Sequence, residues 1–279
     1  MIRLLVLVAL LGGPLDGVEF VPVAAGSYIV GVPGHPRNPR RTVRLEAFEV
    51  ATTEVTNAQF GRFVEATGYL PDANRNGYGM TFQEGMKDWH WDSTRGADWR
   101  HPFGPDQPGI EDKPDHPVTQ ISFQDAQAYC AWAGVRLPTV EEWEVAARAG
   151  SLTRWPWGDE FSPAQANTWQ GQSHAHNTLE DGFLYTSPVK SFAPNAWGLY
   201  DVIGNVFEYC VDERLRDPNG TLPAAGRGGS WWCSQGTCDF FNLVDIGRMH
   251  PRGTLCNQGF RVVRSIDPDS PHETDSRPD

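Results

Sequence analysis

Two cysteines late in the chain, Cys233 and Cys238, are spaced so that their sulfurs could meet. They follow the run Gly228-Gly229-Ser230-Trp231-Trp232, and a strand ending at Cys233 with a turn through residues 234–236 would bring the thiols together. The gap is wider than the two-residue gap of zinc ribbons and thioredoxin-like redox sites. Two thiolates without a neighbouring histidine favour a soft, low-coordinate ion such as Cu(I) over Zn(II). On spacing alone, a structural disulfide or two buried thiols is the simpler interpretation.

Two further constellations combine carboxylates, amides and glycine turns. One contains Asn167-Thr168-Trp169 and then Asp181-Gly182-Phe183; the other contains Tyr200-Asp201 and then Gly204-Asn205-Val206-Phe207-Glu208. Such segments leave backbone carbonyls free beside carboxylates, which are the oxygen ligands that a hard cation such as calcium requires. The same residue types form Asx turns and caps, so the residues alone leave both interpretations open.

A third polar stretch contains alternating histidines, His174 and His176. Because they lie in a polar loop, we interpret both as surface residues and not as metal ligands.

The elements that must position these residues are only partly visible in the sequence. Capping boxes and glycine stops predict helices over residues 56–68, 122–134 and 139–150. Apolar stretches predict strands over residues 20–27, 41–50 and 259–264. The remainder consists mostly of short aromatic or apolar stretches between Gly, Pro, Asn and Asp. Bound metal ions are one device that holds such long irregular connections.

Composition limits the class of protein. The 279 residues can form one domain with a substantial core. With 23 basic and 35 acidic residues, the net charge of −12 argues against nucleic-acid binding. An acidic surface is compatible with a basic peptide partner, although surplus acid usually only keeps a protein soluble. Eleven Trp, 29 Gly and 22 Pro together predict a loop-rich fold in which aromatic side chains fill irregular packing.

The ends of the chain differ from its middle. Residues 1–17 contain one arginine, a short apolar run and small residues, which predicts an export signal; a buried first strand is the alternative. The run is too short to span a membrane as a helix. Residues 267–279 read as a disordered tail, which leaves one domain over residues 18–266. We expect a secreted or periplasmic monomer, with a cytoplasmic location as the alternative. Five cysteines leave at least one thiol unpaired or metal-bound in an exported protein.

Several motifs resemble those of the formylglycine-generating enzymes, or sulfatase-modifying factors. The matching blocks occur in family order at residues 53–60, 99–102, 116–118, 136–139, 167–171, 180–183, 197–208, 228–231 and 259–261. The resemblance covers residues 20–264. It implies an irregular α+β fold, distantly related to C-type lectins and often stabilised by calcium. Relatives with this fold that lack the cysteines serve as binding or non-oxidase proteins.

The resemblance also assigns roles to particular residues. It implies Cu(I) held by Cys233 and Cys238, with Ser230 as the serine beside the pair. It implies one calcium site formed by Asn167, Thr168, Asp181 and Phe183, and a second formed by Asp201, Gly204, Val206 and Glu208. The implied reaction is the oxidation, by dioxygen, of a cysteine in a Cys-x-Pro-x-Arg peptide of an unfolded sulfatase to formylglycine, with release of sulfide.

The segment 239–252 departs from the family pattern, because it is more apolar, has no Arg-Tyr-Arg stretch after the second cysteine, and lacks the Asp-Ser-Ser element. In the family this region helps to line the substrate groove, so we expect a changed peptide preference. Phe240 and Phe241 should point to opposite faces of an extended segment. Two alternative functions are therefore compatible with the sequence. One is a same-fold copper oxidase acting on another thiol or small molecule, and the other is a non-enzymatic calcium-stabilised binding protein.

Phe207 also stands where the family usually has tryptophan. Cys130 corresponds to a family disulfide position, but Val262 stands where its partner is often found. Cys210 and Cys256 are the alternative disulfide pair.

Overall fold

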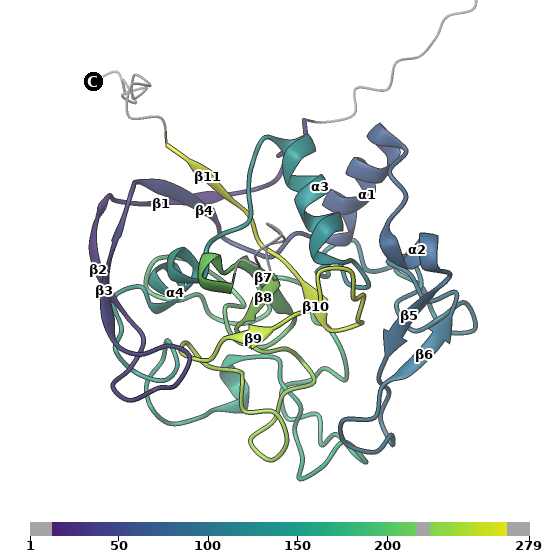
Figure 1. The fold of residues 1–279 in the computed structure, drawn as a ribbon. Coiled ribbons are helices and arrows are strands. Elements are labelled where there is room, and N and C mark those ends of the chain that lie inside the picture. Colours follow the sequence, from purple (N-terminus) through teal and green to yellow (C-terminus); the bar gives the residue numbers. More distant parts are fainter. Residues whose placement is uncertain (1–12, 216–223, 267–279) are drawn as a thin grey trace, which may run out of the picture.

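The computed structural model describes residues 13–215 and 224–266. Residues 1–12 of the predicted export signal and the whole predicted tail, 267–279, lie outside the described residues. The described chain is an irregular α+β fold in which long loops connect short elements (Figure 1). Within it, no helix combines the length and apolar character needed to cross a membrane.

A long antiparallel ribbon runs along one edge of the molecule. Its strands are β1 (Phe20–Val23), β2 (Gly26–Val30), β3 (Arg41–Leu45) and β4 (Phe48–Ala51). β1 pairs with β4 and β2 with β3 in one continuous register, since Val23 faces Phe48 and Gly26 faces Leu45. The predicted strands 20–27 and 41–50 are therefore each broken into two. The physical reason is a change of neighbour: β11 (Val263–Ser265) adds to β4, whereas β2 packs against helix α4.

The second sheet lies at the centre and has the order β10-β7-β8-β9. Its strands are β7 (Phe207–Val211), β8 (Ala224–Arg227), β9 (Gly247–Arg248) and β10 (Gln258–Gly259). The predicted strand 259–264 is thus divided between two sheets, because β10 pairs in parallel with β7 while β11 joins β4. A separate hairpin, β5 (Tyr78–Thr81) and β6 (Asp92–Arg95), forms one flank (Figure 1).

The three predicted helices are present with the predicted caps. They are α1 (Asn57–Thr67), α3 (Phe123–Ala133) and α4 (Val140–Arg148), and each begins with a complete capping box. α1 and α3 end at left-handed glycines, as predicted, whereas α4 ends one residue before Ala149, which adopts a left-handed φ of 46°. A short helix, α2 (Asp72–Asn76), precedes β5. The 3-10 turns are Pro163–Gln165 and Glu213–Leu215.

Two apolar clusters form the core. One surrounds α1 and α3, which lie side by side (Figure 1). The other joins α4, β7 and β8 to loops rich in tryptophan, and it contains Trp143, Trp231 and Trp232 together with Cys233 and Cys238. Aromatic rings of 150–250 Å² can fill the irregular spaces between loops that short strands leave open. The cysteine pair thus belongs to the core that the loops build.

Candidate metal and thiol site

The cysteine pair lies on a loop that follows β8. Cys233 is fully buried and Cys238 nearly so. Gly228 and Gly229 both have positive φ, and a Cβ on Gly229 would come within 2.5 Å of the Cα of Phe241. The glycines therefore let the start of the loop pass directly against the residues that follow Cys238.

The two thiols interact within this loop. Burial raises the pKa of the Cys233 thiol well above its usual range, and the hydrogen bond and electrostatic repulsion from Cys238 raise the pKa further. The N–H of Cys238 donates to the Ser234 carbonyl at 3.2 Å, which closes the turn between the two cysteines. A soft cation that binds here must displace the thiol proton, so its affinity will depend on pH.

Ser230 lies beside Cys233 at the bend of the loop. Its Oγ is 4.0 Å from the Cys233 Sγ. The same oxygen accepts hydrogen bonds from Asn257 Nδ2 at 3.0 Å and from the Trp232 N–H at 3.3 Å. Because two donors occupy the serine oxygen, its own hydrogen is available to the sulfur, and Ser230 can donate to Cys233.

The other three cysteines are unpaired. All five cysteines lie in the described part of the chain, and all five are free and buried. The alternative pairing of Cys210 with Cys256, which the sequence left open, is therefore not formed. The Cys256 Sγ instead accepts from the Phe82 N–H at 3.4 Å, and burial raises the pKa of Cys256 to about 12. These thiols are protonated and enclosed, which makes them unreactive.

The composition of the pair suits a particular kind of ion. Among the residues that the structure describes, no group of three or more His, Cys, Asp or Glu side chains is placed to hold a metal ion. Two adjacent buried sulfurs without a third side-chain ligand do not provide the four ligands of structural zinc. They fit a soft ion of low coordination number such as Cu(I).

The residues predicted for a first calcium site come together in one loop cluster. The two carboxylate oxygens of Asp181 accept the N–H groups of Thr168 at 2.9 Å and Phe183 at 3.0 Å. Asn167 is buried, and within the described structure its side-chain oxygen has no hydrogen-bond partner. An unpartnered buried polar atom costs about 1–3 kcal/mol. A hard cation at this position would satisfy that oxygen.

The carboxylates predicted for the second calcium site surround a buried arginine. Glu208 and Arg261 form a fully buried ion pair with two N···O distances of 2.6 Å. Asp201 and Glu54 lie close to this pair, and each has one carboxylate oxygen without a partner among the described residues. Burial raises the pKa of Asp201 to about 6 and raises that of Glu54 well above its usual range; neighbouring carboxylates contribute to both shifts. Three carboxylates surround one guanidinium, so their mutual repulsion adds to burial in favouring the protonated forms of Asp201 and Glu54.

The two clusters predicted to bind calcium adjoin each other. A Cβ on Gly204 would lie 2.2 Å from the Asn167 carbonyl oxygen, and Gly204 has a φ of +82°. Val206 is fully buried beside them, at the entry to β7. Glu54 was not among the predicted site residues, although it lies in the matched block 53–60. Its carboxylate is placed here by folding, since Asn205 Nδ2 donates to it across 151 residues of sequence at 3.2 Å.

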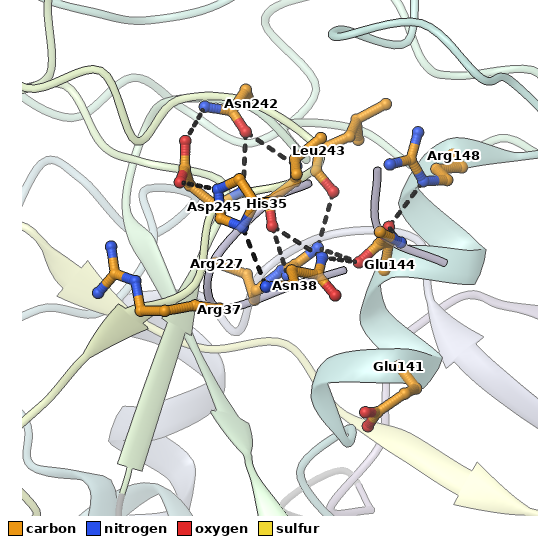
Figure 2. Close-up of polar contacts among 12 residues, drawn as sticks. His35, Arg37, Asn38, Glu141, Glu144, Arg148, Arg227, Asn242, Leu243 and Asp245 are labelled. Carbon is orange, nitrogen blue, oxygen red and sulfur yellow. Dashed lines mark hydrogen bonds and ion pairs between the residues drawn. The ribbon is translucent and has the colours of Figure 1, made fainter. Parts of the chain in front are cut away.

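The segment 239–252 is anchored by a buried polar network (Figure 2). Arg227 donates to the Leu243 carbonyl at 2.7 Å and to Glu144 at 3.0 Å. Asn242 accepts the N–H of Asp245 at 2.8 Å and thereby closes a turn within the segment. Although burial opposes its ionisation, the neighbouring guanidiniums, first that of Arg227, lower the pKa of Glu144. The first residues after Cys238 are thus held from inside the protein.

The two phenylalanines of this segment do face different surroundings, as predicted. Phe241 is buried beside Trp155, with ring centroids 6.1 Å apart. Phe240 is half-buried, and the Arg37 guanidinium lies 5.2 Å from its ring centroid. Leu243 is also buried. Phe240 is therefore the aromatic residue of this segment that remains accessible beside the cysteine loop.

The prediction that both histidines lie on the surface is wrong for His174. His176 is exposed, but His174 is fully buried and its ring stacks on Trp232 at 4.3 Å with an interplanar angle of 7°. Its ring nitrogens contact Asp88 and the Trp232 carbonyl. The sequence offered no signal for this, because the contacting residues lie far from His174 in the chain.

The comparisons with known proteins agree with this fold. The family model described as "Sulfatase-modifying factor enzyme 1-like domain" matches residues 14–266 of this sequence. The structure of PvdO from Pseudomonas aeruginosa is similar with a TM-score of 0.63 and 25% identity, covering 89% of this chain and 94% of that one. The class is therefore that of proteins with this irregular, loop-rich α+β fold. The chain belongs to the sulfatase-modifying factor enzyme 1-like family.

Sequence relatives include proteins named as enzymes and proteins named as inactive. The formylglycine-generating enzyme of Streptomyces coelicolor is 39% identical over 91% of this chain and 88% of its own length. That of Bos taurus is 36% identical, with 90% and 76% covered. The inactive C-alpha-formylglycine-generating enzyme 2 of Bos taurus is 40% identical over 63% of each chain. Family membership therefore does not by itself decide activity, and the residues of the site must.

Proposed function

We propose that this protein is a copper-dependent oxidase that uses dioxygen to convert the cysteine of a sulfatase-type Cys-x-Pro-x-Arg motif to formylglycine. The observation that carries the proposal is the adjacent, buried pair Cys233 and Cys238 in a chain of this family. An inactive binding protein has no need to keep two interacting thiols in its core. The partner is an unfolded sulfatase or a peptide from it.

The residues of the chain have separate roles in this reaction. Cys233 and Cys238 would hold one Cu(I) ion as thiolates, and Ser230 would donate a hydrogen bond to the Cys233 sulfur. Bound Cu(I) would supply a soft site for the substrate thiolate and the redox chemistry that engages dioxygen. Burial excludes bulk water and fixes the pair before substrate arrives. In the net reaction, dioxygen takes two hydrogens from the substrate Cβ–Sγ unit and two further electrons and protons from an external thiol reductant, and is reduced to water. Water then replaces the sulfur, giving the aldehyde and hydrogen sulfide.

Calcium has a structural role in the proposal. Asn167, Thr168, Asp181 and Phe183 would bind one ion, and Asp201, Gly204, Val206 and Glu208 a second. The unpartnered oxygens of Asn167 and Asp201 support these assignments. Both clusters adjoin the loop that leads to the cysteines, since the Trp231 N–H donates to the Asn205 carbonyl at 2.9 Å. Calcium would thus stabilise the loops that support the two thiols.

The test is turnover of a synthetic Cys-x-Pro-x-Arg peptide by protein loaded with Cu(I). Under air, we expect the peptide to lose the mass that accompanies conversion of its thiol to an aldehyde, and we expect sulfide to be released. Neither change should occur under nitrogen. Cys238→Ser should abolish the product. Cys130→Ala is the matched control, because Cys130 is a buried free thiol in the other core cluster. Full peptide conversion by Cys238→Ser would refute the proposal, whereas copper binding with turnover of small thiols alone would indicate the alternative oxidase.

A further inference from the structure

A buried histidine outside the proposed ligand set contacts the backbone of the cysteine loop. The His174 Nε2 lies 2.7 Å from the Trp232 carbonyl oxygen, which belongs to the peptide bond that Trp232 shares with Cys233. The His174 Nδ1 lies 2.7 Å from an Asp88 carboxylate oxygen, which also accepts the His174 N–H at 2.9 Å. One histidine thus joins three loops, 83–91, 170–178 and 230–238.

The contact with the carbonyl places one hydrogen on the ring. A carbonyl oxygen is an acceptor, so Nε2 carries a hydrogen and donates to the Trp232 oxygen, while Nδ1 lies against the Asp88 carboxylate. The rigid ring of His174 is enclosed by Trp232, Trp169 and Phe82, with centroid distances of 4.3, 4.8 and 4.9 Å.

The backbone around Cys233 is held by three hydrogen bonds. The Cys233 N–H donates to the Ser230 carbonyl, and its own carbonyl accepts from the Trp169 N–H, both at 2.9 Å. The preceding carbonyl, that of Trp232, accepts from His174. Two of these bonds join backbone to backbone, whereas the third depends on a replaceable side chain. His174 therefore controls one of the hydrogen bonds that fix the backbone on either side of the Cys233 Cα.

The loop that carries Asp88 contains a residue with a strained backbone conformation. The next residue, Trp89, adopts a left-handed φ of 64°, an uncommon conformation for a bulky aromatic residue. Such strain persists only where the surroundings require it. The Trp89 ring contacts Trp232 edge to face at 4.6 Å. The strained loop thus brings Asp88 to His174 and also contacts the residue before Cys233.

We propose that His174, held in place by Asp88, is a positioning residue that fixes the Trp232–Cys233 peptide and so keeps Cys233 ready to bind a soft metal ion. The inference rests on the proposed function for its chemical purpose. The geometric part, that His174 restrains Cys233, applies to the metal-free chain as well. His174 does not touch the reacting atoms and is not a catalytic residue.

His174→Phe separates hydrogen bonding from packing. Phenylalanine keeps a ring of similar size against Trp232 but donates no hydrogen bond. His176→Phe is the matched control, since His176 pairs with Glu84 at 3.1 Å on the same loop but is exposed. The first measurement is the alkylation rate of Cys233 by N-ethylmaleimide in metal-free protein, resolved by peptide mass spectrometry. Cys130 in the other core cluster reports global unfolding in the same sample.

Loss of a hydrogen bond to a charged group, such as that of His174 with the Asp88 carboxylate, raises the equilibrium constant of local opening by roughly ten- to hundredfold. We expect His174→Phe to raise the alkylation rate of Cys233 by about tenfold or more, with Cys130 and the His176→Phe protein unchanged. Cu(I) affinity, measured by competition with a chromophoric chelator, should fall by a similar factor. An unchanged Cys233 rate, or a parallel rise at Cys130, would overturn the positioning role. Failure of the wild-type protein to bind Cu(I) would instead refute the proposed function, and the alkylation rates would still decide the role of His174.

Discussion

Replacing Asp201 by asparagine should stabilise the metal-free protein and at the same time remove the part of the calcium stabilisation that comes from the second proposed site. One oxygen of Asp201 accepts the Lys190 N–H at 2.8 Å, and the other has no partner among the described residues. Asparagine can keep the first contact with its carbonyl oxygen. Its NH₂ group would replace the unpartnered oxygen, within the cluster that holds the carboxylates of Glu54 and Glu208. The substitution thus removes a buried negative charge without removing a required acceptor.

The magnitude follows from the ionisation of the folded state. Burial raises the pKa of Asp201 to about 6, whereas in the unfolded chain the group ionises near its ordinary value of about 3.9. At pH 7 this difference corresponds to about 3 kcal/mol of lost folding free energy. The variant should recover most of it. For a chain of this length, the melting temperature should rise by roughly 6–12 °C in the presence of a chelator.

The assay is thermal unfolding at pH 7 with EDTA and with calcium. Wild-type protein should gain stability from calcium, because a ligand of the folded state alone raises the melting temperature. Asp201→Asn should gain less from calcium than the wild type, because only the first proposed site remains intact. Asp212→Asn is the control: its carboxylate is buried and pairs with Arg214 at 2.8 Å, away from both clusters, so it should destabilise and leave the calcium effect intact. A destabilised Asp201→Asn protein that still responds fully to calcium would refute the reasoning.

Three further outcomes are expected. Cys238→Ser should lose Cu(I) binding in a chelator competition while its melting temperature changes little, because serine replaces the thiol with similar volume. Phe241→Ala should lower the free energy of unfolding by about 3–5 kcal/mol in urea, whereas Phe240→Ala should leave stability nearly unchanged and alter the turnover of the sulfatase peptide relative to a simple thiol. The raised pKa values of Asp201 and Glu54 mean that protonation favours the folded state, and this stability is lost as pH rises through the folded pKa. Metal-free protein should therefore melt higher at pH 5 than at pH 7, and calcium should help less at pH 5; the opposite order would show that the carboxylates are already compensated.

The helix starts were predictable because their determinants are local. Thr56, Ser122 and Thr139 each accept a hydrogen bond from the N–H three residues later, and the side chain at that later position returns the contact. Such a cap needs only four consecutive residues. The strands were less predictable, because their limits depend on which neighbour each half of a strand meets. The β1–β4 and β2–β3 pairs keep one register, yet each joins different partners.

His174 shows why polar loop residues were misjudged. A histidine between serine, alanine and a second histidine has the local composition of a surface loop. Its burial results from Asp88 and Trp232, which lie 86 and 58 residues away along the sequence. No local pattern encodes a contact of that separation. His176, two residues later, meets no such partner loop and stays exposed.

The sequence by itself determined the family, the helix caps and the spacing of the Cys233–Cys238 pair, because each depends on residues close together in the chain. Tertiary structure decided that Cys210 and Cys256 stay unpaired and that Glu54 joins the carboxylates around Arg261. These outcomes depend on burial and on contacts between distant loops. Burial sets the protonation of thiols and carboxylates, and long-range packing sets which of them are neighbours.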